Sequence, residues 1–264
     1  MNEHAHPIEP SGDTSPGPAA EAILEEARQR LEARQQAEGV PELSQQQRTL
    51  LRSVNHLIYQ LCKHWVALFN LVDGLYVGGS FLAPILMQTG HEGAAAVVYR
   101  FYKLFCHQYP VRSWFLQGSR IVTYGAASTA LDAELQYARD FIGNATLGYK
   151  VAFCQRDVAI YGAILVTGLL YGLLRHRWRS PIPWWVYIFL GLVPMGVDGG
   201  YQIISQLLGQ LHLFPWLPVY ESTALMRLLT GAAFGAMTVA FIYPQMNEFF
   251  EETKELLSSR YGWK

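Results

Sequence analysis

Long apolar runs separated by polar segments extend over most of the chain. Four of these runs carry few Lys or Arg residues, at residues 64–88, 153–174, 181–208 and 222–244. A helix rises about 1.5 Å per residue and a hydrocarbon core is about 30 Å thick, so each run is long enough to span a membrane. The pattern predicts an all-α, polytopic membrane protein built as a bundle of about four transmembrane helices. A large soluble helical domain is the alternative, which so many apolar runs disfavour.

The N-terminal part of the chain lacks such a run. Residues 1–18 are polar and rich in Pro, Gly and Ser, and we expect them to be disordered. Residues 19–38 are strong helix formers, but their apolar stripe is thin. A second, amphipathic helix is expected to begin at the cap-like Ser44 and to lie along the membrane surface before the first span. Its apolar face comprises Leu50, Leu51, Val54, Leu57, Ile58 and Leu61.

These segments predict the organisation of the whole chain. The expected parts are a disordered tail (1–18), peripheral helices (19–62), a membrane domain (63–245) and a cytoplasmic amphipathic tail (246–264). Within the membrane domain, residues 92–106 are too short and too basic to span, so we expect a short helix that returns toward the membrane face. Residues 111–150 are predicted to form a polar extramembrane excursion.

The distribution of basic residues predicts the orientation. The loop between the second and third runs carries Arg175, Arg177 and Arg179, whereas the next loop carries no Lys or Arg. Cytoplasmic loops are enriched in Lys and Arg, so the former loop should be cytoplasmic, and four spans then place both termini inside. The chain is accordingly expected to be a multi-pass protein of the cell membrane, in contact with the lipid bilayer.

Composition narrows the function classes. The chain is 51% hydrophobic and 16% charged with a formal net charge of −1, and no basic stripe with interleaved aromatics is present, so nucleic acid is not an expected partner. The sequence contains no phosphate loop, HExxH or haem-attachment motif, and no organic cofactor is expected. Whether the protein is an enzyme stays open at this point.

The predicted topology brings cysteine, histidine and aspartate to the outer end of the bundle. Cys106 and His107 follow the short helix, and Cys154 and Asp157 are three apart, which places them on one helix face. Thiolates, imidazole and carboxylate are ligands of zinc, the first choice, and of iron, the second. The alternatives are a disulfide between Cys106 and Cys154 and a helix-capping role for His107. Cys62 is expected to be a small packed hydrophobe.

Further polar residues fall near the outer ends of the third and fourth runs. A charged side chain in a membrane segment is costly unless it faces a partner or a wet cavity, so a functional site is one reading and a structural ion pair is the other. Arg227 is the expected counter-charge of Asp198, and Arg112 is expected to turn back toward Asp157 or Asp198. The candidates for catalysis or ligand binding are Asp198, Gln202, Glu221, Arg227 and Arg112.

Four motifs carry a family resemblance: CHQYPVRSWFLQG, CQRDVAIYGA, GVDGGYQ and ESTALMRLLTGAAFG. In this order they resemble the predicted membrane proteins of domain-of-unknown-function family 2085, found in bacteria and archaea, over residues 60–245. In that family the second motif commonly reads Cys-x-Arg-Cys-x-Gly-Ile-Tyr; here Asp157 stands at the second Cys and Ala159 at the Gly. An aspartate keeps an anionic donor, which favours a metal over a disulfide. The resemblance implies an integral membrane protein with a metal-binding motif set, and it supplies no activity.

Two functional hypotheses follow. In the first, a metal at the outer face adjoins a polar pocket, and the protein is a metal-dependent hydrolase or a binder of a polar ligand. In the second, the protein is a scaffold or subunit of a membrane complex with a structural metal or disulfide, and the N-terminal helices dock a second copy or another subunit. A transporter is the weaker third hypothesis, because no inverted repeat is visible.

Overall fold

A computed structural model of the 264-residue chain describes residues 25–30, 44–116, 133–211 and 220–263. The predicted tail, residues 1–18, and most of the first predicted helix lie outside the described residues. The chain divides into two compact units, Met1–Val54 and Asn55–Lys264.

The described part of the first unit is helical. Residues 25–30 form a short helix, and α2 (Gln45–Gln88) begins in this unit and continues into the second. Ser44 starts α2 with a capping box: the Gln47 amide donates to Ser44 Oγ (3.3 Å), and the Ser44 amide donates to Gln47 Oε1 (2.9 Å). Because α2 runs without a break to Gln88, the expected amphipathic helix and the first predicted span are one uninterrupted helix.

Among the described residues, four helices are long and apolar enough to cross a membrane, which confirms the predicted fold class. They are Gln45–Gln88 (α2), Gln155–Leu174 (α6), Trp184–Gly209, and Ala224–Tyr261 (α9). The third combines α7 (Trp184–Val186), the π-helix η2 (Tyr187–Leu192) and α8 (Val193–Gln210). The wide π turn ends just before Pro194, whose ring lacks an N–H and would crowd the preceding carbonyls of a regular helix.

Helix α9 is longer than the predicted fourth span. It continues through Pro244 to Tyr261 and ends at Gly262, whose φ of 68° and hydrogen bond from its amide to Ser258 O (2.8 Å) form a left-handed cap. Its N-cap is Thr223, whose Oγ1 accepts from the Met226 amide at 3.2 Å. The neighbouring Ser222 hydroxyl donates instead to the carboxylate of Asp198.

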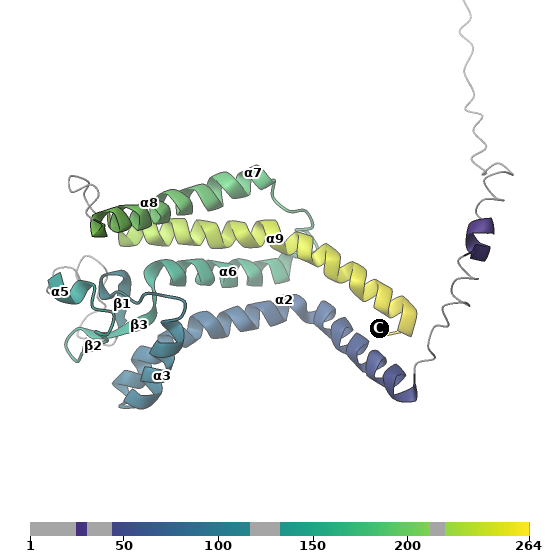
Figure 1. The fold of residues 1–264 in the computed structure, drawn as a ribbon, viewed down its shortest axis with the longest axis horizontal. Helices are drawn as coiled ribbons and strands as arrows, with labels where there is room; N and C mark the ends of the chain where they lie inside the picture. The colour runs from purple at the N-terminus through teal and green to yellow at the C-terminus, as the bar shows by residue number, and fades with distance from the viewer. Residues whose placement is uncertain (1–24, 31–43, 117–132, 212–219, 264) are drawn as a thin grey trace, which may run out of the picture. The chain divides into compact units, whose positions relative to one another are not determined.

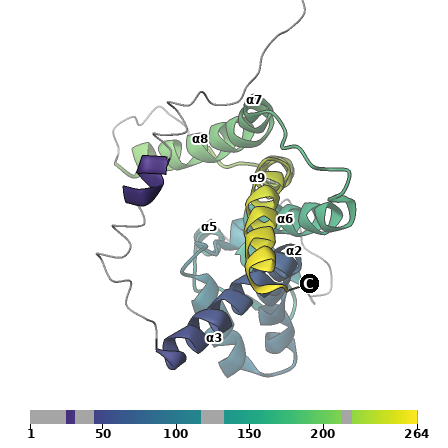
Figure 2. The ribbon, with the colours of Figure 1, turned by 90° about the vertical axis from the view of Figure 1, so that its right-hand side faces the viewer.

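Glycines let the helices approach closely. Figures 1 and 2 both place α9 beside α6, and a Cβ added at Gly231 of α9 would lie 2.9 Å from the carbonyl oxygen of Arg156 in α6. At Gly235 it would overlap the carbonyl of Ile160. Small residues at such positions allow backbone contact between membrane helices.

A small sheet, absent from the sequence prediction, occupies the region between the first two spans. Its strands are β1 (Ser113–Leu116), β2 (Gly143–Asn144) and β3 (Gly148–Cys154), in the antiparallel order β1-β3-β2. Around it lie α3 (Glu92–Tyr102), the 3-10 turn η1 (Pro110–Arg112) and α5 (Ala133–Gln136). The register pairs Ser113 with Cys154, the last residue of β3. Helix α6 begins at the next residue, so β3 leads directly into α6. Figure 1 shows the sheet at one end of α6.

Two corrections to the predicted boundaries follow. The short helix ends at Tyr102 and not at residue 106, and Cys106 lies in the turn that follows. The second span begins at Gln155, because Cys154 is the last residue of β3.

The core of the second unit has two main clusters. One joins α2 and α3 to the sheet through Ala83, Ala95, Tyr99, Tyr102, Cys106, Val151, Ala152 and Phe153. The other joins α2, α6 and α9 through Trp65, Val66, Tyr171, Val239 and Tyr243. The first cluster positions the candidate metal ligands.

Candidate metal centre

Three of the predicted ligands meet where β3 becomes α6. Cys106 comes from the turn after α3, Cys154 ends β3, and Asp157 lies in the first turn of α6. Their two sulfur atoms and a carboxylate oxygen all lie within 4.8 Å of one another. The Cys154 thiol donates to Asp157 Oδ2 at 3.1 Å. A single ion placed between these atoms could contact all three, given zinc distances of about 2.0–2.3 Å.

The turn that presents Cys106 is held by buried hydrogen bonds. Gln108 has a φ of 55°, a left-handed conformation that is uncommon outside glycine. Its side-chain amide donates to Tyr99 O (3.0 Å), and its backbone carbonyl accepts from Lys150 Nζ (2.9 Å). Pro110 then begins η1, which ends the turn. Beside this turn Cys106 is buried, whereas the next residue, His107, is exposed.

His107 lies outside the cluster. Its ring is exposed and stacks on Tyr109, with ring centroids 5.7 Å apart. Adjacent side chains diverge unless the backbone turns sharply between them, and here the turn comes one residue later, at Gln108. The structure therefore joins three of the four predicted ligands.

All three cysteines are free thiols, so the structure contains no disulfide between Cys106 and Cys154. Cys62 is buried in α2, as expected for a packed residue. The pKa of Cys154 is raised well above its usual range, first by its hydrogen bond with Cys106, then by burial and by the charge of Asp157. The Cys154 thiol is therefore protonated at neutral pH.

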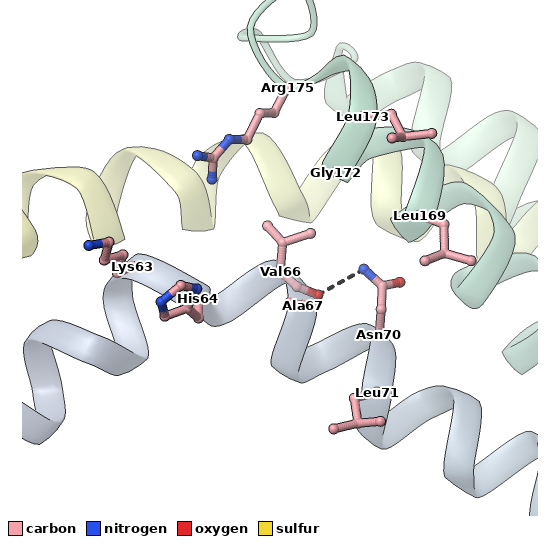
Figure 3. Close-up of a pocket in the computed structure, with 10 residues that line it drawn as sticks. All are labelled: Lys63, His64, Val66, Ala67, Asn70, Leu71, Leu169, Gly172, Leu173 and Arg175. Atoms are coloured by element: carbon pink, nitrogen blue, oxygen red, sulfur yellow. Dashed lines mark hydrogen bonds between the residues drawn. The ribbon is translucent and has the colours of Figure 1, made fainter.

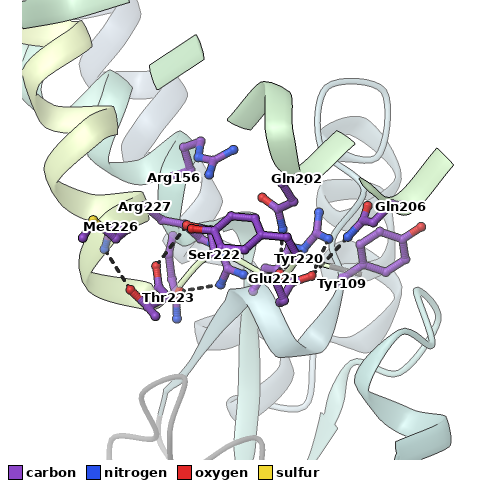
Figure 4. Close-up of polar contacts among 12 residues, drawn as sticks. Tyr109, Arg156, Gln202, Gln206, Tyr220, Glu221, Ser222, Thr223, Met226 and Arg227 are labelled. Carbon is purple, nitrogen blue, oxygen red and sulfur yellow. Dashed lines mark hydrogen bonds and ion pairs between the residues drawn. The ribbon is translucent and has the colours of Figure 1, made fainter. Parts of the chain in front are cut away.

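The second feature is a charge network around Glu221. Arg112 binds this carboxylate with two hydrogen bonds, from Nε to Oε1 and from Nη2 to Oε2, each 2.8 Å long. Gln202 and Gln206 donate to it at 2.7 and 3.1 Å, and Arg227 forms an ion pair with it (Figure 4). The charge-assisted bidentate geometry makes Glu221 the centre of the network.

A separate group of three side chains surrounds Asp198. Its carboxylate forms an ion pair with Arg156 and accepts from the Ser222 hydroxyl at 2.7 and 2.8 Å and from the Tyr220 hydroxyl at 3.0 Å. Ser222 thus fixes Asp198 instead of capping α9.

These contacts correct two expectations. Arg227 pairs with Glu221 and not with Asp198. Arg112 also pairs with Glu221, and neither Asp157 nor Asp198 is its partner. Both arginines converge on Glu221, which precedes α9, because η1 and the start of α9 lie together at this end of the bundle.

A polar cavity of about 490 Å³ joins the cluster to the network. Cys106, Cys154 and Asp157 line it together with Arg112, Arg156, Gln202, Gln206 and Arg227. His107 also lines it, whereas the candidates Asp198 and Glu221 do not, although both pair with arginines that do.

The sequence reasoning missed several polar groups here. Gln155 is fully buried and accepts from Arg227 Nη1 at 3.2 Å; Gln206 and Tyr220 also belong to the networks. Their signal was weak: Gln155 and Gln206 are uncharged, and Tyr220 lies in a loop between spans.

The four apolar helices and the comparisons define an integral membrane protein. Residues 141–241 match the model of a family described as predicted membrane protein (DUF2085), which confirms the resemblance seen in the motifs over this part of the chain. An uncharacterised protein of Methanocaldococcus jannaschii is 27% identical over 169 residues, which cover 62% of this chain and 81% of that protein. No solved structure matches the chain.

Proposed function

We propose that this membrane protein binds a divalent transition metal, zinc in the first place and iron in the second, through Cys106, Cys154 and Asp157. The observation that carries the proposal is the meeting of two thiols and a carboxylate within 4.8 Å at the wall of a polar cavity. The donor set suits zinc, whose usual ligands include thiolate and carboxylate.

Charge balance at the cavity supports a divalent ion. The three guanidiniums of Arg112, Arg156 and Arg227 are matched by the three carboxylates of Asp157, Asp198 and Glu221. A divalent ion that displaces the two thiol protons leaves this balance unchanged. The ion would also relieve the mutual repulsion of two thiolates and Asp157.

The ligand count supports a role beyond structure. Structural zinc sites close with four protein ligands, whereas sites that bind substrate keep one position open for water or ligand. Here three side chains meet, and the cavity lies beside them. The proposed function is therefore a metal centre that binds a polar ligand from the cavity, with metal-dependent hydrolysis as the reaction it would support.

The arginines would act on that ligand only indirectly. A carboxylate pairs with each of Arg112, Arg156 and Arg227. These arginines therefore shape the cavity and set its electrostatic potential. Gln202 and Gln206, which also line the cavity, donate to Glu221.

Metal analysis of the detergent-purified protein tests the ligands. Cys106→Ser, Cys154→Ala and Asp157→Asn should each lower the metal content, whereas Cys62→Ser, a matched loss of a buried thiol elsewhere, should keep it. Equal metal content in all four variants would remove the proposal. Cys106→Ser and Asp157→Asn are nearly isosteric, so folding can be checked by thermal unfolding.

A second experiment tests the open position. His107→Ala should retain the metal, because the ring lies outside the cluster. In the cobalt-substituted protein, thiolate charge-transfer bands should report sulfur ligation, and added azide should shift the d–d bands only if a position is open. Metal loss in His107→Ala, together with no response to azide, would point to a closed structural site.

A non-enzymatic scaffold is the second candidate function. The observation that favours it is the saturation of Glu221 and Asp198 by internal hydrogen bonds, which leaves these carboxylates as structural elements. Such a scaffold would use the N-terminal helices to dock a second copy or another subunit. The azide experiment separates the two candidates.

The orientation belongs to the proposal as well. Both termini are placed in the cytoplasm and the metal centre on the extracytoplasmic side, on the argument from Arg175, Arg177 and Arg179. A cysteine introduced as Arg177→Cys should be shielded from an impermeant reagent added to intact cells. Labelling from outside would reverse the orientation.

A further inference from the structure

A groove of about 750 Å³ lies between α2 and α6, away from the metal centre (Figure 3). Its lining combines three basic side chains, Lys63, His64 and Arg175, with the leucines Leu71, Leu169 and Leu173. No Asp or Glu is among its lining residues.

The two kinds of side chain are separated along the groove. In Figure 3 Lys63, His64 and Arg175 lie toward one end, and Leu71 and Leu169 lie toward the other. At about 1.5 Å per residue, Lys63 is about 12 Å along α2 from Leu71, and Leu169 is about 9 Å along α6 from Arg175. This is the spacing between the phosphate of a phospholipid and the upper part of its acyl chain.

The groove also lies at the right level for a lipid. Both walls are helices long and apolar enough to span a membrane, and Arg175 follows the last residue of α6. Lys63 and His64 fall at the start of the first apolar run. The basic end is thus at a membrane boundary and the leucine end extends toward the hydrocarbon, where Leu71, Leu169 and Leu173 are all exposed.

From this charge complementarity we propose that the groove binds one anionic phospholipid. The phosphate lies among Lys63, His64 and Arg175, and an acyl chain runs over Leu71, Leu169 and Leu173. Basic side chains beside a span attract anionic headgroups, and the apolar continuation distinguishes a bound lipid from a free anion. The predicted orientation places this groove in the cytoplasmic leaflet, where anionic lipids are enriched. The site is independent of the metal centre.

Native mass spectrometry tests the proposal. The protein, purified from bilayers of equal phosphatidylglycerol and phosphatidylcholine, should retain one phosphatidylglycerol. Each basic residue near a headgroup is worth about fivefold in affinity, so Lys63→Gln combined with Arg175→Gln should weaken retention about twenty-five-fold. The control, Arg177→Gln combined with Arg179→Gln, removes two charges from the neighbouring loop outside the lining and should retain the lipid.

A second variant tests the apolar half. Leu169→Trp should fill the groove and displace the lipid while all three basic residues remain. Equal retention of phosphatidylcholine, unchanged retention in both groove variants, or a dimer that excludes lipid and is disrupted by Leu169→Trp would each overturn the proposal. The last outcome would identify a second copy of the chain as the occupant.

Discussion

The two ends of α6 and α9 bury different chemistry. At the sheet end, Arg227 in the first turn of α9 and Gln155, the first residue of α6, are both fully buried and hydrogen-bonded to each other. Sixteen residues further along each helix, about 24 Å away, Tyr243 and Tyr171 pack instead against Trp65. One end is therefore held by charges and hydrogen bonds, and the other by aromatic contacts.

This difference gives the two ends different roles. Buried charges persist only where partners compensate them, and removal of one partner leaves an unpaired charge. Aromatic contacts between membrane helices depend on close packing, since lipid is as apolar as the side chains and supplies little hydrophobic drive. The cavity and the candidate ligands lie at the charged end, and the aromatic end fixes the helices that carry them.

Among single substitutions, the largest loss of stability is expected at Glu221. Glu221→Ala leaves Arg227, which is 1% exposed, and Arg112 without their carboxylate, and should lower the free energy of unfolding by about 3–5 kcal/mol. Thermal or denaturant unfolding in detergent measures this. The control is Asp140→Asn, whose side chain is 94% exposed in its pair with Lys103 and whose loss should leave the unfolding midpoint unchanged. Equal midpoints for Glu221→Ala and the control would contradict a charge-held end.

At the aromatic end, Trp65→Leu should cost about 1–3 kcal/mol. The indole is 1% exposed and packs against Tyr243 and Phe250, with ring centroids 5.2 and 5.1 Å apart, so the substitution removes close contacts. Trp184→Leu is the matched control, since Trp184 is 66% exposed and should tolerate the change. Comparison of the two midpoints in one detergent measures the packing contribution; a larger loss in Trp184→Leu would count against it.

Two buried tyrosines, Tyr99 beside the sheet and Tyr171 at the aromatic end, allow a finer comparison of the two ends. Tyr99 donates to Lys150 O at 2.6 Å, so Tyr99→Phe should destabilise by about 1 kcal/mol. The Tyr171 hydroxyl is buried without a hydrogen-bond partner among the described residues, so Tyr171→Phe should be neutral or slightly stabilising. Unfolding midpoints test the pair, and the opposite order would show that the contrast between the ends is wrong.

The remaining prediction is a change of stability with pH. Burial lowers the pKa of Lys150 to about 7, with a smaller contribution from the charge of Lys103, whereas Asp140 acts in the opposite direction. Between that value and the ordinary lysine pKa of about 10.4, the unfolded chain binds a proton that the folded chain lacks, so stability should rise from pH 7 toward pH 10. A neutral amine still has two N–H groups for the carbonyls of Gln108 and Arg139.

Lys150→Met should flatten that slope. Unfolding midpoints at several pH values between 7 and 9 measure it, and Lys103→Met, which removes a partly buried neighbour, should keep most of the rise. A falling wild-type profile, or equal slopes in wild type and Lys150→Met, would contradict the assignment.

Much of the architecture could be predicted because it depends on local pattern. The four apolar runs, the cap at Ser44, and the pairing of Cys154 with Asp157 three residues later each depend on spacing within a short stretch of sequence. The close approach at Gly231 likewise follows from small residues four apart.

The sheet could not be predicted in the same way. Strand β3 is buried at five of its seven positions, so it lacks the alternation that marks a half-buried strand. β2 has only two residues, too few for any pattern. The polar composition of the surrounding segment suggested an irregular excursion instead.

The sequence by itself determined which groups need partners, and the tertiary structure alone decided which partners they have. Arg112, Arg227, Asp198 and Glu221 were recognisable because charge near a membrane span is costly wherever the chain goes. Their pairing depends on how η1, α6, α8 and the start of α9 meet, and Arg112 reaches Glu221 across 109 positions of sequence. The same applies to the metal centre: local spacing brings Cys154 to Asp157, but only the turn at Gln108 brings Cys106 to both and leaves His107 outside.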